Sequence, residues 1–329
     1  MRLLLASLAL LWAAAAHAEV KEVNAAKQYG LGYLQLVLME DQKLVEKQAK
    51  AAGLGDIKVN WSTFRSSDVM NDALLSGSVD FVSLGVPGLA TIWAKTRGNI
   101  DVRGASGLNA APLLLLTRDP KIRTIKDYTE KERIALPAVK VSNQAIILQM
   151  AAAQAFGEAN WAKLDALTVS MAHPDSLNAL LSGNSEITSY FSSPPFQYKA
   201  LQKEGVRKVL NSYDVLGGPV SFNAIATTAK FRQQNPKTYD AYVAALKEAT
   251  DIINKDKRAA AQSYLRVTGD KTPLDEFMVM MNDPDIEFTM KPLNMLKLVD
   301  FMHKTGAIKV KPSSWQDLFF ENVHGMGGS

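Results

Sequence analysis

The segment Asp72–Gly85 constrains the fold most, because its pattern returns in the segment Asn178–Tyr190. Both copies contain Ala-Leu-Leu-Ser-Gly, and an acidic residue follows the glycine three positions later. Each copy predicts a helix that ends at its glycine, Gly77 or Gly183, since glycine adopts the left-handed conformation without a Cβ clash. A short strand is expected directly after each helix.

The two predicted strands finish in small or polar residues, and a proline follows each of them. These strand ends are Ser83, Leu84 and Gly85 in the first copy, and Ser192 and Ser193 beyond the second. Ala-Leu-Leu-Ser-Gly alone is a common way to end a helix, but the shared context favours a true repeat. Ligands of open α/β sheets bind beyond the carboxyl ends of the strands, so the repeat predicts two lobes that face a common ligand site.

The first residues have the features of a secretory signal peptide. Arg2 supplies a positive charge, Leu3 to Ala16 form an apolar run, and Ala16-His17-Ala18 matches the small-x-small cleavage pattern. We therefore expect residues 1–18 to be removed on export. The run is too short to span a bilayer comfortably, and no other run reaches the roughly 18 apolar residues of a membrane helix.

Cysteine is absent from the sequence. Its absence excludes disulfides, thiolate metal sites, a thiol nucleophile and a lipid-modified cysteine at the cleavage site. An exported protein that diffuses freely is retained where an outer membrane encloses it. We therefore expect a soluble protein of a Gram-negative periplasm without a lipid anchor.

Charged residues of both signs are mixed along the chain, with 37 Lys and Arg against 33 Asp and Glu. A nucleic-acid-binding protein would need a clustered basic face, so we expect no nucleic-acid partner. The length that remains after removal of the signal peptide suggests two domains, each large enough for its own core. We expect the protein to be a monomer.

Strands and helices alternate through the first half of the chain, beginning with a strand near Val20 and a helix from Tyr33 to Ala52. This alternation predicts an α/β fold with crossover helices. The Lys- and Arg-rich connector 117–128 and the break Gly217-Gly218-Pro219 are the expected hinge crossings. We predict a two-lobed α/β architecture, with mixed sheets flanked by helices: lobe one is 19–117 plus 219–329, and lobe two is 118–218.

The predicted helix that begins after Ser142 is the best candidate for ligand contact. Ser142, Asn143 and Gln144 place a hydroxyl and two amides at its N-terminus, and Lys140 is close in sequence. A helix N-terminus carries partial positive charge and free N–H groups, which favour an anion. An ordinary N-cap is the alternative interpretation.

The other candidate ligand-binding residues follow strand ends or lie at a hinge. They are Gln28 and Tyr29 after the first strand, Arg65 as a counter-ion for an anion, Ser83, Leu84 and Gly85, Ser192 and Ser193, and Phe222 on the returning strand. Each has a structural alternative, such as a surface loop, a tight turn, a helix cap, a solvated arginine or a core phenylalanine.

No catalytic constellation is present in the sequence. There is no Walker loop, no Gly-x-Ser-x-Gly elbow and no Gly-x-Gly-x-x-Gly fingerprint. His173, His303 and His324 are isolated and lack metal-ligand spacing. We therefore expect no catalytic residues, no metal and no cofactor.

Together, the segment Ala73–Gly85, the run Ile134-Ala-Leu-Pro137 with Ser142, and the echo Leu181-Ser-Gly183 resemble one known family. It comprises the periplasmic solute-binding proteins of ABC importers, in the nitrate, sulfonate and taurine group that shares the NMT1/THI5-like fold. The resemblance implies the type II periplasmic-binding-protein fold and a receptor that closes about a hinge on a small organic or inorganic anion. It also implies delivery of that small-molecule ligand to an ABC permease at the inner membrane.

The ligand class stays open between alternatives. The family's pocket positions correspond to Gln28 and Tyr29, to Ser83 and Leu84, and to Ser142 and Asn143, but the loop after the first strand departs from that of sulfonate binders. A receptor for a neutral or cationic heterocycle, such as a pyrimidine, would need carboxylates and aromatic stacking. An enzyme like the family's pyrimidine-forming synthase would need a cysteine-rich motif, which this chain lacks.

Overall fold

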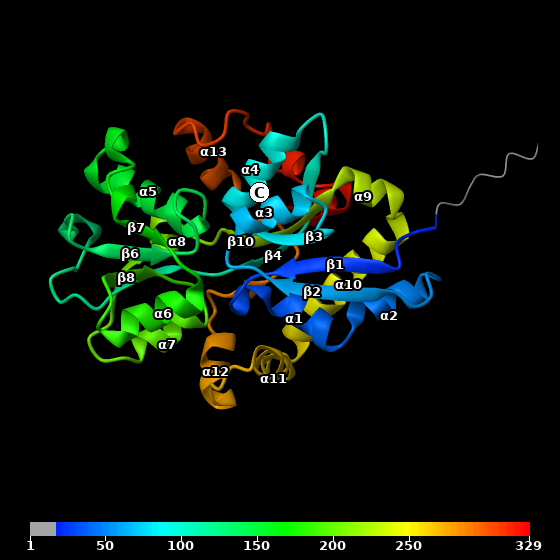
Figure 1. Ribbon diagram of the computed structural model, residues 1–329, viewed down its shortest axis with the longest axis horizontal. Coiled ribbons are helices and arrows are strands. Elements are labelled where there is room, and N and C mark those ends of the chain that lie inside the picture. Colours follow the sequence, from blue (N-terminus) through cyan, green and yellow to red (C-terminus); the bar gives the residue numbers. More distant parts are fainter. Residues whose placement is uncertain (1–17) are drawn as a thin grey trace, which may run out of the picture.

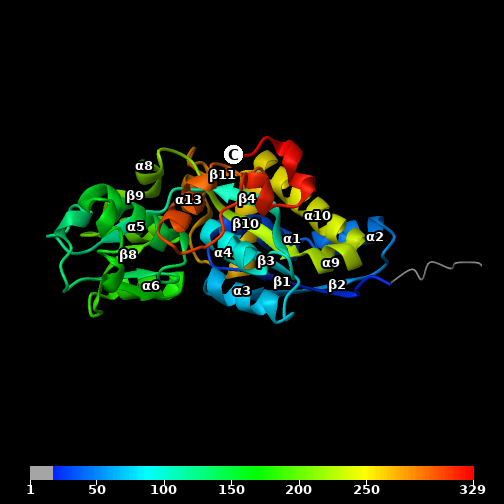
Figure 2. The same cartoon turned by 90° about the horizontal axis from the view of Figure 1, so that it is seen from above.

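The computed structural model describes residues 18–329, so the predicted signal peptide lies outside the described residues except for Ala18. Two separate sheets lie side by side in the molecule and form the cores of two lobes (Figures 1 and 2). The first sheet has six strands in the order β11-β4-β10-β3-β1-β2, and the second has five in the order β7-β6-β8-β5-β9. We call them, with their helices, lobe one and lobe two.

The strands of lobe one are β1 Glu22–Lys27, β2 Lys58–Thr63, β3 Phe81–Gly85, β4 Val102–Ala110, β10 Ser221–Thr228 and β11 Glu287–Phe288. Those of lobe two are β5 Leu114–Thr117, β6 Arg133–Leu136, β7 Thr168–Ser170, β8 Ile187–Phe191 and β9 Arg207–Asn211. In each lobe three strands are parallel and the next two alternate in direction. The predicted α/β fold with two mixed sheets is confirmed.

The helices between these strands flank the sheets. They are α1 Leu34–Asp41, α2 Leu44–Ala51, α3 Ser67–Leu75, α4 Val86–Thr96, α5 Asn143–Phe156, α6 His173–Ser182, α7 Phe196–Leu201, α8 Ser212–Leu216, α9 Ala229–Gln234, α10 Pro236–Lys255, α11 Lys257–Thr268, α12 Leu274–Met281 and α13 Leu296–Lys304. Short 3-10 helices are η1 Leu31–Tyr33, η2 Ile125–Asp127, η3 Glu158–Asn160, η4 Asp165–Leu167, η5 Trp315–Leu318 and η6 Glu321–Met326.

The sequence repeat corresponds to a repeat of topology. The order β4-β10-β3-β1-β2 of lobe one matches the order β9-β5-β8-β6-β7 of lobe two, so the motif strands β3 and β8 occupy equivalent central positions. The glycines that end the preceding helices have φ of 76° at Gly77 and 74° at Gly183, as predicted. Both lobes therefore present equivalent strand ends toward each other.

Two expectations were wrong in detail. The apolar run 114–117 pairs with β8 and β9, so the first crossing precedes β5 instead of following it. A fully buried strand is apolar on both sides, and its sequence does not tell which sheet it joins. The single helix expected from Tyr33 to Ala52 is two helices, because Lys43 adopts φ 50° between α1 and α2.

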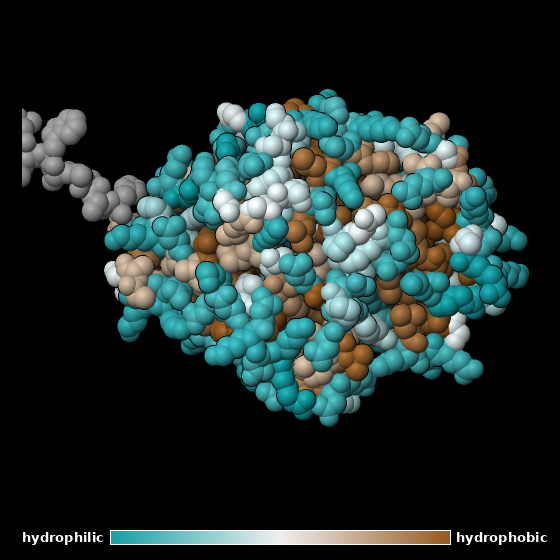
Figure 3. Space-filling view, turned by 180° about the vertical axis from the view of Figure 1, so that it is seen from behind, coloured by the Kyte–Doolittle hydropathy of each residue, from teal (hydrophilic) through white to brown (hydrophobic). Residues whose placement is uncertain are grey.

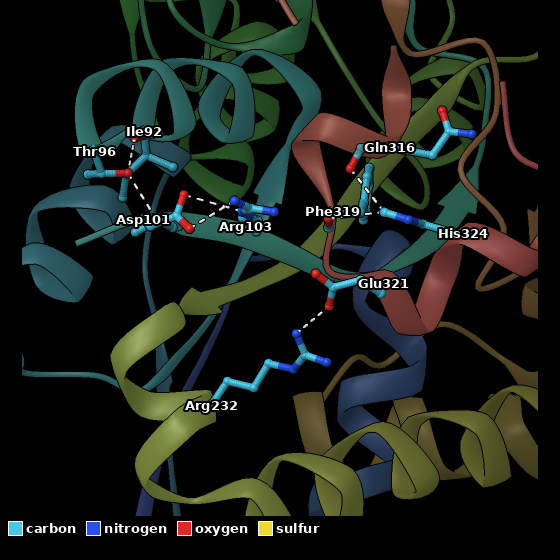
Figure 4. Close-up of polar contacts among 10 residues, drawn as sticks. Ile92, Thr96, Asp101, Arg103, Arg232, Gln316, Phe319, Glu321 and His324 are labelled. Atoms are coloured by element: carbon cyan, nitrogen blue, oxygen red, sulfur yellow. Dashed lines mark hydrogen bonds and ion pairs between the residues drawn. The ribbon is translucent and has the colours of Figure 1, made fainter. Parts of the chain in front are cut away.

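The C-terminal tail is fastened to lobe one by polar contacts and by ring packing. The Arg232 guanidinium pairs with the Glu321 carboxylate at 2.6 Å (Figure 4), and Phe320 N donates to Gly104 O at 2.8 Å. The Phe319 ring lies directly on Gly104, where a Cβ would be 2.4 Å from two ring carbons. The absence of a side chain at Gly104 thus allows the tail to pack against β4.

The surface of the described residues is mixed in character. On the face opposite that of Figure 1, hydrophilic residues cover much of the outline and hydrophobic residues gather in separate patches (Figure 3). Among the exposed large hydrophobic residues, Leu201 of lobe two and Val279 of lobe one line the same shallow groove between the lobes. Within residues 18–329, no helix combines the length and the apolar character that a membrane span requires.

Gly104→Ala should destabilise lobe one, because the new methyl group would overlap the Phe319 ring. Overpacking of this kind costs about 1–3 kcal/mol, and each kcal/mol lowers the Tm by about 2–4 °C in a chain of this size class. Differential scanning calorimetry measures the shift. Gly325→Ala is the matched control, since a Cβ at Gly325 meets no atom within 4 Å; equal Tm values for the two variants would contradict this packing of the tail.

Candidate functional site

The two lobes touch where the carboxyl ends of their strands meet. Leu31 N donates to Pro194 O at 2.8 Å, and Asn143 Nδ2 donates to Phe222 O at 2.9 Å. The Leu31 and Phe222 ends of these bonds belong to lobe one, and the Pro194 and Asn143 ends belong to lobe two. This junction is therefore closed in the structure.

Two glycines permit this close approach. A Cβ on Gly85 would lie 2.4 Å from Asn143 Nδ2, and one on Gly30 would lie 2.9 Å from Pro194 O. Gly30 also has φ 120°, which an L side chain rarely adopts. Gly85 ends β3 and Gly30 lies in the loop after β1, so bare backbone lines the junction on the side of lobe one.

The strand-end loops of lobe one are joined by a cluster of hydrogen bonds. Gln28 Nε2 donates to Ser67 Oγ at 3.2 Å and to Ser83 O at 3.0 Å, while Gly85 N donates to Ser67 Oγ at 3.0 Å. The loops after β1, β2 and β3 thus meet at Ser67. We call Gln28, Ser67, Ser83 and Gly85 the lobe-one cluster.

The loop after β1 is held from beneath by the core of lobe one. The Gly32 carbonyl accepts hydrogen bonds from Asn223 Nδ2 at 3.4 Å and from the Asn109 amide. Tyr33 Oη donates to Asn223 Oδ1 at 3.2 Å. These buried bonds fix the turn that carries Gln28, Tyr29 and Gly30 into the junction.

Lobe two presents an equivalent cluster on its own strand-end loops. His173 Nε2 lies 3.1 Å from Ser193 Oγ and 3.4 Å from Gln144 Nε2, and His173 Nδ1 is hydrogen-bonded to the Tyr190 hydroxyl. Because the Gln144 amide nitrogen only donates, Nε2 accepts and the ring proton resides on Nδ1. We call Gln144, His173, Tyr190 and Ser193 the lobe-two cluster.

His173 is neutral in this environment. Burial lowers the pKa of its imidazole from 6.5 to about 3, because the charged form would lose its hydration. The Phe196 ring stacks on His173 with centroids 5.4 Å apart and planes inclined by 16°. Hence the lobe-two cluster carries hydrogen-bonding groups but no net charge at neutral pH.

Four helices of at least eight residues begin at this junction, namely α3, α4, α5 and α6. Only α5 has a side-chain cap among these four, where Ser142 Oγ accepts from Ala145 N at 3.2 Å. The first-turn N–H groups of α3, α4 and α6 have no such cap. Uncapped helix N-termini carry partial positive charge, so the junction is electrostatically suited to an anion.

A cavity of about 540 Å³ opens beside the junction. It is lined by both lobes, with Trp61, Tyr264, Val37 and Val267 from lobe one and Phe196 and Pro174 from lobe two. Polar residues complete the lining: Lys27, Gln28, Tyr29, Gly30, Glu40, Thr63, Lys199, Thr268, Asp270 and Lys271.

The charged groups of the cavity are mostly paired. Lys27 Nζ pairs with Glu40 and lies 5.3 Å from the Trp61 ring centroid. Lys199 Nζ of lobe two lies 2.7 Å from both carboxylate oxygens of Asp270 in lobe one. Partial burial opposes ionisation of Asp270, but hydrogen bonds from Lys199 and Thr272 outweigh it and lower the pKa of that carboxyl. The Lys199–Asp270 pair thus joins the lobes as an ionic clasp.

The structure brings many of the predicted residues together. Gln28, Gly85, Gln144 and Ser193 belong to the two clusters, as does the Ser83 carbonyl. Asn143 and the Phe222 carbonyl join the lobes, and the carbonyl oxygen of the Asn143 side chain is buried without a partner. Tyr29 is 41% exposed and lines the cavity.

Other predicted residues have structural contacts instead. The Ser83 hydroxyl donates to Ala26 O, Leu84 is part of the core, and the Ser142 hydroxyl caps α5. The Ser192 hydroxyl is buried and bonded to Ser193 O. Arg65 is exposed and pairs with Asp68 at 3.7 Å, outside the cavity lining.

Sequence reasoning missed several residues of the junction. Ser67 and His173 begin the equivalent helices α3 and α6. Both helices end in the Ala-Leu-Leu-Ser-Gly repeat, so the repeat is the sequence signal that points to both residues. Trp61, Lys199 and Asp270 are brought to the cavity by tertiary packing. No local pattern in the sequence signals those three.

The sequence profile of the NMT1-like family matches residues 24–267. Similar solved structures include the alkanesulfonate-binding protein SsuA of Xanthomonas axonopodis pv. citri bound to MOPS, at TM-score 0.68 and 15% identity over 90% of this chain and 96% of that one. The periplasmic aliphatic sulphonate binding protein SsuA of Escherichia coli has a TM-score of 0.66 and 19% identity, over 92% of this chain and 93% of that one. The periplasmic nitrate-binding protein NrtA of Synechocystis PCC 6803 has a TM-score of 0.67 and 15% identity, over 91% of this chain and 84% of that one. These likenesses show the fold, and no curated protein sequence matches the chain.

The depressed pKa of His173 predicts a pH-dependent loss of stability. Between pH 6.5 and about 3 the unfolded chain binds a proton at this residue that the folded chain does not. Stability should therefore be full above pH 6.5 and fall with pH below it, by up to about 1.4 kcal/mol per pH unit from this group. Urea unfolding from pH 7.5 to 4.5 measures the slope.

His173→Gln should flatten this slope, while the exposed control His303→Gln should retain it. The difference between variants isolates His173 from the carboxylates that titrate in the same range. An identical slope in His173→Gln and the unmodified protein would contradict the assignment of a buried neutral imidazole.

Proposed function

The chain belongs to the NMT1-like family, and from that membership we propose that it is the solute-binding receptor of an ABC importer. In this proposal the protein captures a small organic or inorganic anion, of the sulfonate, taurine or nitrate kind, and the lobes close on it. The signal sequence and the absence of cysteine support a periplasmic location without a lipid anchor. The partners would be the small-molecule ligand and an ABC permease at the inner membrane, with the receptor itself a monomer.

The observation that carries the proposal is the convergence of four helix N-termini on one junction. Around them lie neutral hydrogen-bonding groups from both lobes, including the Gln28 and Gln144 amides, the Ser67 and Ser193 hydroxyls and Gly85 N–H, which bond within their own clusters in the structure and would exchange some of these bonds for bonds to a ligand. Neither cluster contains a carboxylate. Two of the four helices carry one acidic residue in the first turn, Asp68 in α3 and Asp175 in α6. Asp68 is engaged by Ser66 and Arg65. Such a site stabilises negative charge without a formal cation.

Because one cluster lies in each lobe, a ligand held by both clusters would draw the lobes together about the hinge. Each lobe carries only half of the donors, and the chain crosses between lobes at two places, before β5 and before β10. A ligand that bonds both clusters binds the closed form better than the open form, and it shifts the equilibrium by that difference. The closed surface that results is what a permease would recognise.

The cavity lining favours one second candidate, a receptor for a neutral or cationic heterocycle. Trp61, Phe196 and Tyr264 offer rings for stacking, and Glu40 and Asp270 are carboxylates in the same cavity. We rank it second because both carboxylates are already paired with lysines. Binding of a pyrimidine to the protein, lost in Asp270→Asn, would favour this candidate.

A charge placed at the helix N-termini tests the anion proposal. Ser67→Asp would put a carboxylate at the start of α3, and it should weaken binding of the best anion in a sulfonate, nitrate and carboxylate panel by at least about 100-fold, since like charges repel in a partly desolvated site. Isothermal titration calorimetry measures the loss. Ser76→Asp is the control at the other end of the same helix and should bind normally; equal affinity in both variants would contradict the proposal.

The ionic clasp tests closure separately. Lys199→Ala and Asp270→Ala should each weaken anion binding about five-fold, because a partly buried pair contributes about 1 kcal/mol to the closed form. The double variant should lose no more than either single one, since both remove the same pair. Calorimetry of the three variants gives the coupling. The exposed Lys203→Ala is the control, and additive losses in the double variant would show that the two residues act independently.

A further inference from the structure

The cavity beside the junction is too large for a simple inorganic anion. Its volume of about 540 Å³ falls within the range of roughly 300–1,000 Å³ typical of pockets for drug-sized ligands. Nitrate or sulfate would leave nearly all of it filled by water. Resting on the function proposed above, we propose that this cavity is a subsite for the aromatic tail of an organic anion, whose acidic head lies between the two clusters.

The cavity walls have the chemistry that such a tail requires. Trp61 and Phe196 provide ring surfaces and Val267 adds aliphatic surface, while the largely buried Tyr264 and Val37 complete the apolar wall. Trp61 is supported from the core by the Tyr242 ring, with centroids 6.5 Å apart, and Lys27 Nζ lies over it. These rings belong to packed elements, so they offer a preformed surface for an aromatic group.

The cavity shares one residue with the lobe-one cluster and adjoins the lobe-two cluster. Gln28 is a member of the lobe-one cluster and also lines the cavity. Phe196 lines the cavity and stacks on His173, the centre of the lobe-two cluster. Gly30 of the junction lines it too. A ligand with its acidic head at the clusters therefore has its substituent directed into this cavity.

The charges of the cavity favour a neutral tail. Lys27 is paired with Glu40, and Lys199 is paired with Asp270. Lys271 is exposed at the cavity. A ligand group that took an ionic contact from Lys27 or Lys199 would have to break one of these pairs, whereas an uncharged ring would leave both intact. This selects ligands such as arylsulfonates or arylcarboxylates over inorganic anions and short aliphatic ones.

The experiment compares ligands that differ only in the tail. Isothermal titration calorimetry should be run with methanesulfonate against benzenesulfonate, with acetate against benzoate, and with nitrate. The aromatic member of the pair whose head the site accepts should bind about 30-fold more tightly, as expected for burial of a phenyl group. Nitrate should bind at least about 30-fold more weakly than the aromatic ligand.

Thr63→Phe fills the cavity from within while sparing the anion site. Thr63 is exposed on β2 and lines the cavity, and the next residue back, Ser62, points to the opposite face of the strand. In Thr63→Phe the affinity for the aromatic ligand should fall until it exceeds that for the short ligand by no more than about three-fold. The affinity for the short ligand should be unchanged. Ser62→Phe is the matched control and should keep the full preference for the aromatic ligand.

The outcomes separate the two proposals. If short and aromatic members of a pair bind the unmodified protein equally, or if Thr63→Phe weakens both alike, the tail subsite is wrong and anion capture stands. If none of the five anions binds, the proposed function is wrong, and the tail subsite that rests on it is wrong too. An aromatic preference that Thr63→Phe abolishes and Ser62→Phe retains supports the subsite.

Discussion

The close approach of bare backbone to the opposite lobe is the contact on which the rest of the structure depends. Gly30 lies against Pro194 and Gly85 lies against the Asn143 amide, at distances that leave no room for a Cβ. There the strand-end loops of the two lobes, which carry the polar clusters, come into contact. The ionic clasp, the cavity and the helix N-termini all take their positions from this junction.

Charge at the junction comes from the backbone rather than from ionised side chains. His173 is buried and neutral, Arg65 pairs with Asp68 outside the cavity lining, and the cavity lysines Lys27 and Lys199 are paired with carboxylates. What remains for an anion is the partial charge of four helix N-termini and a set of neutral donors. In the proposed function the ligand takes hydrogen bonds from both lobes, and this requirement would couple binding to closure.

Much of the fold was predictable because short local sequence patterns determine it. The repeated Ala-Leu-Leu-Ser-Gly predicted the equivalent strands β3 and β8, and positive φ at Gly77 and Gly183 ended the helices as expected. The sheet to which β5 belongs was not predictable, since its run of leucines is apolar on both faces of the strand and would suit either sheet. Gln28, Asn143 and Gln144 were found from their place after strands or at a helix start. Trp61, Lys199 and Asp270 were not, because only tertiary packing brings α7, β2 and the end of α11 together.

The central claim is that an anion closes the two lobes, and a distance between the lobes tests it most directly. The chain has no cysteine, so Lys203→Cys in lobe two and Val279→Cys in lobe one give a unique pair of exposed spin-label sites. Double electron–electron resonance should show a longer, broader distance distribution without ligand, and a single shorter distance with a saturating anion. A distribution that does not change when an anion is demonstrably bound would contradict closure, and with it the proposal that the two clusters hold the ligand between the lobes.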